Sequence, residues 1–230
     1  MHRIDRIFYE LVTLANDRHA EKFRQLIQSD SKPPGFFTVV KTLCLTYTVP
    51  GSTACGILAA CKEVRSLACW VDNQSPQLPL LVSRLPLRRL SIELEHFSSI
   101  PVDPSSLWLS SLTHIDLVPW GDFPAQGLSK LRHFPRLTHV ALNPARMSGT
   151  PEHIAIVCSS CPCLQVLILL RRRNSPDPGP QQEHDHRIVM LEEPNGRMED
   201  WEASYFGHED IWSRAEVIVA KQKAMSVGSE

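Results

Sequence analysis

The sequence predicts an α/β solenoid, in which a curved parallel sheet carries short helices on its convex side and helical caps cover both ends. Two observations lead to this fold class. A six-residue template with apolar residues at its first, fourth and sixth positions recurs six times between residues 40 and 169. Successive copies begin 23 to 27 residues apart, which is the spacing of repeats built from one strand and one helical segment.

The template copies are predicted to be the strands. Alternate side chains of a strand point to the same face, so the fourth and sixth template positions face one core. The copies lie at residues 40–45, 64–69, 87–92, 112–117, 137–142 and 164–169, and a last strand is expected at 187–191.

The segments between the copies are predicted to be short helices that return the chain to the next strand. They cover residues 52–62, 77–85, 105–111, 124–134 and 151–160. Pro86, Pro135 and Pro162 lie just before predicted strands, where a helix has to end.

A repeat array exposes apolar surface at each end, so caps are expected there. Residues 1–39 are predicted to form a helical N-terminal cap of two amphipathic helices that are separated near Asn16 and Asp17. Residues 192–230 are predicted to form a C-terminal cap and tail, with a helix that starts after Asp210 and covers the far end of the repeats. Within the repeat region 40–191, residues 171–186 are rich in proline and charge and predict an exposed loop.

Charge and cysteine content narrow the class of protein. The chain has 24 Lys+Arg and 25 Asp+Glu, and its formal charge of −1 disfavours nucleic acid or a membrane surface as a partner. The sequence shows neither a signal peptide nor a run of eighteen apolar residues. Seven cysteines, an odd number, favour reduced thiols and a cytoplasmic or nuclear location.

The cysteines are predicted to pack in the core rather than bind metal. Cys158 and Cys161 form a C-x-x-C pair, but a structural zinc site needs four ligands and no second pair of this kind exists. Cys61 and Cys161 each lie three residues before the first apolar position of a template copy, where a small apolar side chain fits under the turn. We therefore expect no metal and no cofactor.

Side chains that alternate with the apolar template positions face the concave side, where we expect a protein partner to bind. Arginine next to tryptophan is a combination typical of binding hot spots. The predicted partner-binding residues are Arg65, Trp70, Arg88, Arg89, Glu93, His114, Asp116, His139 and Asn143.

His114, Asp116 and His139 could hold a metal or share a proton. However, the repeat contains Leu-Thr-His twice, at 112–114 and 137–139, and this duplication itself explains the two histidines. No catalytic residue is expected.

The phrases CKEVRSLACWV (61–71) and CPCLQVLIL (161–169) resemble the cysteine-bearing repeats of fungal F-box-type leucine-rich-repeat proteins. The resemblance covers residues 40–191, and the segment 207–223 is similar to the closing part of such proteins. It implies a non-enzymatic substrate receptor of a cullin-type ubiquitin ligase, in which F-box helices hold a Skp adaptor and the repeats hold the target.

The N-terminal part departs from this pattern. An F-box is a three-helix unit, whereas residues 1–39 lack its usual Leu-Pro opening, and residues 6–11 are at most a remnant or a helical lead-in. Two alternatives therefore stay open beside the ligase role. One is a degenerate or truncated leucine-rich-repeat scaffold outside the ubiquitin system, and the other is a metal- or thiol-dependent enzyme.

Overall fold

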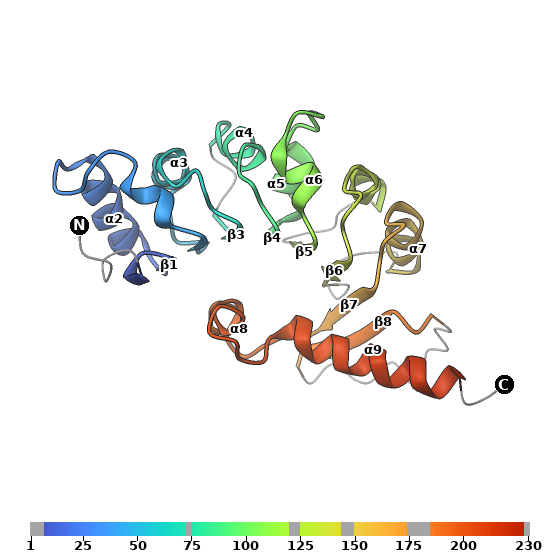
Figure 1. The fold of residues 1–230 in the computed structure, drawn as a ribbon. Helices are drawn as coiled ribbons and strands as arrows, with labels where there is room; N and C mark the ends of the chain where they lie inside the picture. The colour runs from blue at the N-terminus through green and yellow to red at the C-terminus, as the bar shows by residue number, and fades with distance from the viewer. Residues whose placement is uncertain (1–6, 72–74, 120–124, 144–149, 174–184, 228–230) are drawn as a thin grey trace. The chain divides into compact units, whose positions relative to one another are not determined.

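The computed structural model is an α/β structure built from parallel strands and short helices (Figure 1). It describes residues 7–71, 75–119, 125–143, 150–173 and 185–227. The contacts within the chain define two compact units. The first comprises Met1–Val118 with His133–Arg136, and the second comprises Pro119–Arg132 with Leu137–Glu230.

Within its described residues, the first unit contains five parallel strands that pair in sequence order. The fourth template position lines up from strand to strand, so that Leu43 lies opposite Leu67, and Leu67 opposite Leu90. The strands predicted at 40–45, 64–69, 87–92 and 112–117 are thereby confirmed. The strands are β1 (Leu11–Leu14), β2 (Thr42–Leu45), β3 (Ser66–Cys69), β4 (Arg89–Glu93) and β5 (His114–Val118).

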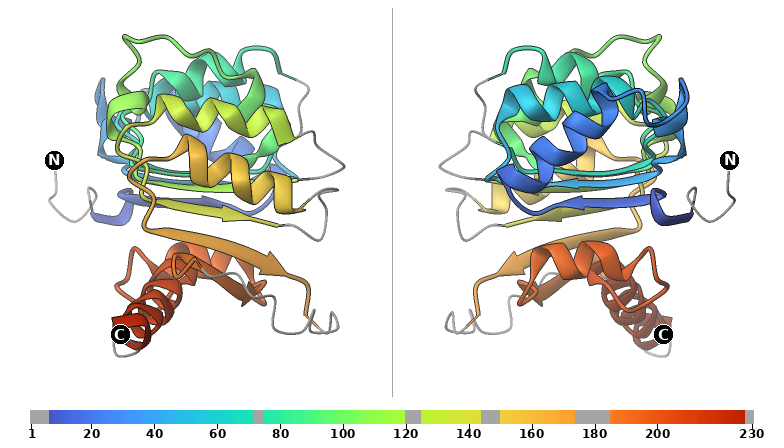
Figure 2. Two further views of the ribbon diagram at one scale, coloured as in Figure 1. Left: turned by 90° about the vertical axis from the view of Figure 1, so that its right-hand side faces the viewer. Right: turned by 90° about the vertical axis from the view of Figure 1, so that its left-hand side faces the viewer.

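Helical segments of the first unit cover one face of these strands (Figures 1 and 2). The apolar template residues are buried beneath them, together with an aromatic cluster of Phe97, Trp108 and Phe134. Four predicted helices are confirmed, as α2, α3, α4 and α6, whereas η1 and α5 were not expected. The segments are α2 (Asp17–Gln28), η1 (Phe36–Val39), α3 (Gly51–Ala60), α4 (Leu78–Ser83), α5 (Leu94–Ser99) and α6 (Leu107–Ser111).

The N-terminal cap differs from its prediction. Helix α2 begins after Asn16, whose side chain accepts a hydrogen bond from the backbone N–H of His19 at 2.9 Å, as expected for a helix start. Residues 11–14, however, form strand β1 rather than a helix. Val12 pairs with Leu43, which places Tyr9 at the first template position of an additional repeat. Residues 1–6 of the predicted cap lie outside the described residues.

The described part of the second unit contains three parallel strands, β6 (His139–Leu142), β7 (Val166–Arg171) and β8 (Ile188–Glu192). These confirm the strands predicted at 137–142, 164–169 and 187–191. The helical segments are η2 (Ala125–His133), whose last residue belongs to the first unit, α7 (Thr150–Ser160), α8 (Arg197–Ala203) and α9 (Ile211–Val227). Of these, η2, α7 and α9 match predicted helices. Residues 174–184 of the predicted loop 171–186 lie outside the described part of the chain, and Arg171 belongs to β7.

Helix α9 packs on a strand face and not, as predicted, on the end of the repeats. Trp212 and neighbouring apolar residues of α9 form one buried cluster with Val166, Ile168 and Leu170 of β7. These three side chains alternate with the template residues, so α9 lies on the face opposite α7 (Figure 1). Within this unit, the face that the sequence predicts to be open for a partner is covered by the chain's own helix.

Two polar contacts fix the start of α9. The backbone N–H of Ser213 donates to Asp210 Oδ1, and the backbone N–H of Asp210 donates to Ser213 Oγ, both at 2.9 Å. Such a reciprocal pair satisfies two backbone groups at the helix start. Arg214 donates to Asp200 of α8 at 3.0 Å, so α8 and α9 are tied together.

Candidate protein-binding surface

The nine predicted partner-binding residues divide between the two units. Seven lie in the first unit, on or beside strands β3, β4 and β5: Arg65, Trp70, Arg88, Arg89, Glu93, His114 and Asp116. His139 and Asn143 belong to the second unit. The burial and the contacts of each residue decide whether its side chain is accessible to a partner.

In the first unit, the predicted residues Trp70 and Asp116 are buried in a hydrogen-bonded chain. The indole N–H of Trp70 donates to Ser91 Oγ at 2.8 Å, and Ser91 Oγ donates to Asp116 Oδ2 at 2.6 Å. Trp70 is 6% exposed. Because Trp70 already serves the internal network, its replacement by alanine would disturb the fold and could not act as a pure test of binding.

Glu93, at the end of β4, is also buried. Its carboxylate lies 3.3 Å from Nδ1 of His96, a fully buried histidine in the following helix α5. His96 was not among the predicted site residues, because it lies outside the strand template and in helix α5, which was not predicted. Only its position three residues after Glu93 could have suggested the contact.

The predicted residues at the starts of the strands are more accessible. Arg65 and Arg88 are exposed, and Arg89 and His114 are half-buried. His114 Nδ1 lies 2.8 Å from the hydroxyl of Thr113, the residue before it. The open part of the predicted surface of this unit is therefore at the strand starts. It is not at Trp70, which follows β3, or at Asp116 in the middle of β5.

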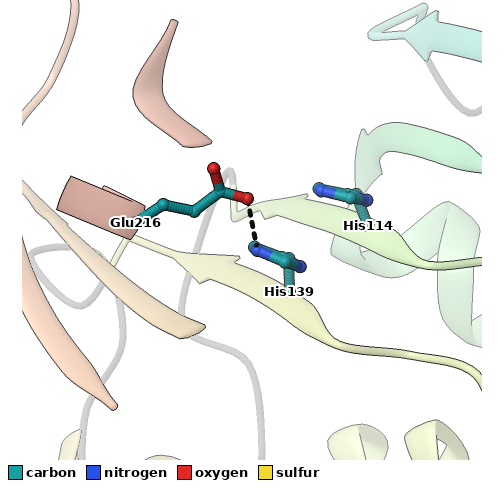
Figure 3. A group of neighbouring side chains, drawn as sticks. All are labelled: His114, His139 and Glu216. Atoms are coloured by element: carbon teal, nitrogen blue, oxygen red, sulfur yellow. Dashed lines mark hydrogen bonds and ion pairs between the residues drawn. The ribbon is translucent and has the colours of Figure 1, made fainter. Parts of the chain in front are cut away.

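In the second unit, both predicted residues contact the C-terminal segment. His139 is 5% exposed, and its Nε2 lies 3.1 Å from the carboxylate of Glu216 in α9 (Figure 3). The His139 ring also makes an edge contact with Trp212, with ring centroids 5.8 Å apart. Asn143 is buried and donates a hydrogen bond to Glu193. These contacts position α9 and the segment after β8. They leave little of the His139 and Asn143 side chains accessible to a partner.

The His139–Glu216 pair is a polar contact between a strand and a helix. It offers two ligand atoms, whereas protein zinc sites use three or four protein ligands, so the pair alone does not define a metal centre. The Glu216 side chain is half exposed, and His139 carries a charge only when it is protonated, so the contact is a hydrogen bond between a buried imidazole and a half-exposed carboxylate. His114, which Figure 3 also draws, lies on β5 of the first unit.

The buried thiols behave as apolar core groups. Burial raises the pKa of Cys61, Cys69 and Cys161 to about 12 in each case. Cys61 and Cys161 share the same local structure, because the backbone N–H of each donates to the carbonyl four residues earlier at 3.0 Å. Protonated thiols are poor nucleophiles and poor metal ligands, which agrees with the packing role predicted for these two positions.

Thiol alkylation checks this assignment. We expect iodoacetamide at pH 8 to modify exposed Cys163 first, while Cys61, Cys69 and Cys161 react only after unfolding, because they are buried and protonated. Peptide mass spectrometry of the native and the denatured chain measures the rate at each site. Labelling of Cys61 in the native chain as fast as that of Cys163 would contradict the assignment.

Comparison with protein-family models and with curated proteins finds no match to this chain. In the described part of the chain, every helix is too short or too polar to cross a lipid bilayer.

Proposed function

We propose that the chain is a leucine-rich-repeat solenoid that acts as a protein–protein interaction module in the cytoplasm or nucleus. The observation that supports this most directly is the register of the first unit. Thr42, Ser66, Arg89 and His114 occupy the same template position on four neighbouring strands. A repeated register places such residues in rows across the sheet, and rows of this kind suit an extended protein surface.

The accessible strand starts of the first unit are the preferred binding region. Arg65 and Arg88 are exposed there, and arginine is enriched at protein interfaces. The second unit plays a structural role in this proposal, since α9 occupies its strand face.

The specific version of this function is substrate recognition for a cullin-type ubiquitin ligase. It rests on the resemblance of residues 61–71 and 161–169 to fungal F-box-type leucine-rich-repeat proteins. A Skp adaptor and a cullin would then be further partners. Within the described residues up to 39, strand β1 is followed by α2 and η1, so these residues do not form a complete three-helix box.

The two alternative functions, a scaffold and an enzyme, require different properties of the chain. A scaffold outside the ubiquitin system would bind its partner without an adaptor or a cullin. A thiol-dependent enzyme would need a reactive cysteine, and the raised pKa values of Cys61, Cys69 and Cys161 argue against those three.

Affinity capture of the tagged chain from its native lysate, followed by mass spectrometry, tests the proposal. Recovery of a Skp adaptor and a cullin with further proteins would support the ligase role. Recovery of another stable protein without them would support a scaffold outside the ubiquitin system. Capture of no protein above the level of a tag-only control would contradict an interaction module.

A further inference from the structure

The second template position forms a ladder across the strand starts of the first unit. The carbonyl of Lys41 accepts the backbone N–H groups of Arg65 and Ser66 at 2.8 and 3.0 Å. The carbonyl of Arg65 accepts those of Arg88 and Arg89 at 2.7 and 3.0 Å. Each strand therefore starts in a fixed position relative to the next, and the second-position residues are direct neighbours. In strand order they are Glu10, Lys41, Arg65, Arg88 and Thr113.

The basic residues of this ladder differ in whether a carboxylate lies close to them. Lys41 lies 3.6 Å from the carboxylate of Glu63, and its Nζ also donates to the carbonyl of Thr38 at 2.8 Å. Arg65 and Arg88 are exposed, and neither forms an ion pair with another of the described residues. Two arginines consequently stand side by side just before the neighbouring strands β3 and β4, with their charges open to solvent.

Folding does not require arginine at positions 65 and 88. Neighbouring parallel strands lie about 4.8 Å apart, and like charges directly opposite each other destabilise a sheet. Thr113 occupies the next place on the same ladder, and Thr138 holds the equivalent position in the second unit. A neutral residue therefore fits the position. The arginine pair is better explained by a ligand that neutralises it.

We propose that Arg65 and Arg88 bind an acidic segment of the partner protein. This inference rests on the proposed function and names the chemistry of the partner. The planar guanidinium group of arginine forms two parallel hydrogen bonds to a carboxylate, which gives such contacts both energy and direction. An acidic segment would remove the repulsion between the two arginines on binding.

The spacing of the arginines favours an extended segment with two acidic residues separated by one other residue. Alternate side chains of an extended chain point the same way and lie about 6.7 Å apart. The two arginine side chains branch from backbone segments about 4.8 Å apart, and their guanidinium groups repel each other. They can therefore spread apart to contact two acidic side chains about 6.7 Å apart. Nucleic acid is a poorer fit, because its binding proteins neutralise several phosphates at once and this chain carries a formal charge of −1.

Peptide selection on the full chain tests the proposal. We expect panning of a random dodecapeptide library to enrich sequences with Asp or Glu at two positions one residue apart. Synthetic copies of these peptides should bind at least about tenfold more weakly to the Arg65→Glu/Arg88→Glu variant, and more weakly at raised salt. A peptide with lysines in place of the two acidic residues should bind that variant and restore part of the loss.

A matched control separates this site from general charge attraction. Arg18 and Lys22 are exposed on helix α2, so Arg18→Glu/Lys22→Glu makes the same change in net charge away from the ladder. This control should keep its affinity within about twofold.

Four results would overturn the proposal. Enriched peptides without acidic residues would leave an interaction module but not this partner chemistry. Equal weakening in both double variants would indicate attraction to the overall charge. Binding of single-stranded (dT)12 as tight as that of the peptides would identify a general anion site. Failure to enrich any peptide would count against the proposed function as well.

Discussion

Trp212→Ala is expected to lower the free energy of unfolding of the second unit by about 3–5 kcal/mol. Trp212 anchors α9 in the buried cluster with Val166, Ile168 and Leu170, and its ring also contacts His139. Truncation to alanine would leave a cavity between the helix and the strands. Urea unfolding followed by far-ultraviolet circular dichroism measures the loss, and hydrogen exchange of the β7 amides locates it.

Val217→Ala is the matched control for this prediction. Val217 lies in the same helix but is 52% exposed, so its truncation should change the free energy of unfolding by no more than about 0.5 kcal/mol. If Trp212→Ala were as mild as Val217→Ala, α9 would not be a structural element of this unit.

Leu90→Ala is expected to cost about 2–5 kcal/mol of stability in the first unit. Leu90 is 1% exposed, and its strand β4 pairs with β3 on one side and β5 on the other. The cavity would therefore be enclosed by neighbours that cannot easily collapse into it. Urea unfolding of the full chain measures the effect.

Arg88→Ala, two residues earlier, is the control for Leu90→Ala. The Arg88 side chain is exposed and faces a like charge, so its removal should leave stability within about 0.5 kcal/mol or raise it slightly. Equal losses in both variants would contradict the assignment of Leu90 to the core and of Arg88 to the exposed position just before β4.

The strands could be predicted because their pattern is local and repeated. Each copy places apolar residues two apart, and the proline residues before several copies mark the ends of the preceding helices. A recurrence of 23 to 27 residues leaves room for little besides one strand and one helical segment, which is why α3, α4, α6, η2 and α7 were also found.

Strand β1 was not predicted because the apolar residues around it fit both the helical spacing and the strand template. Ile7, Phe8, Leu11 and Val12 recur at helical spacing, while Val12 and Leu14 also satisfy the strand template. The choice depends on pairing with β2, a contact between residues about thirty positions apart that no local pattern encodes.

The position of α9 was predicted incorrectly, although the sequence contains a signal for it. Residues 166–170 are all apolar, and an unbroken apolar run is typical of a strand that is buried on both faces. The run thus indicates that something covers the second face of β7. It does not identify the cover as α9, because the apolar residues of that helix fit an end cap equally well.

The burial of Trp70 and Asp116 could not be foreseen from residue types. Both belong to classes that often contact partners, and only the register of β3, β4 and β5 brings Ser91 between them. The ladder of Arg65 and Arg88 follows from the template itself, since both occupy its second position. The sequence could therefore place these two arginines as neighbours, but not show which predicted residues remain exposed.

Comparative affinity capture tests the central proposal most directly. Wild type, Arg65→Glu/Arg88→Glu and Arg18→Glu/Lys22→Glu chains would be captured in parallel from the native lysate, and the bound proteins quantified by mass spectrometry. An interaction module that binds through its strand starts should yield at least one protein that is retained by wild type and the control but lost from the Arg65/Arg88 variant. Identical recovery with all three chains, or recovery of nothing above a tag-only control, would contradict it.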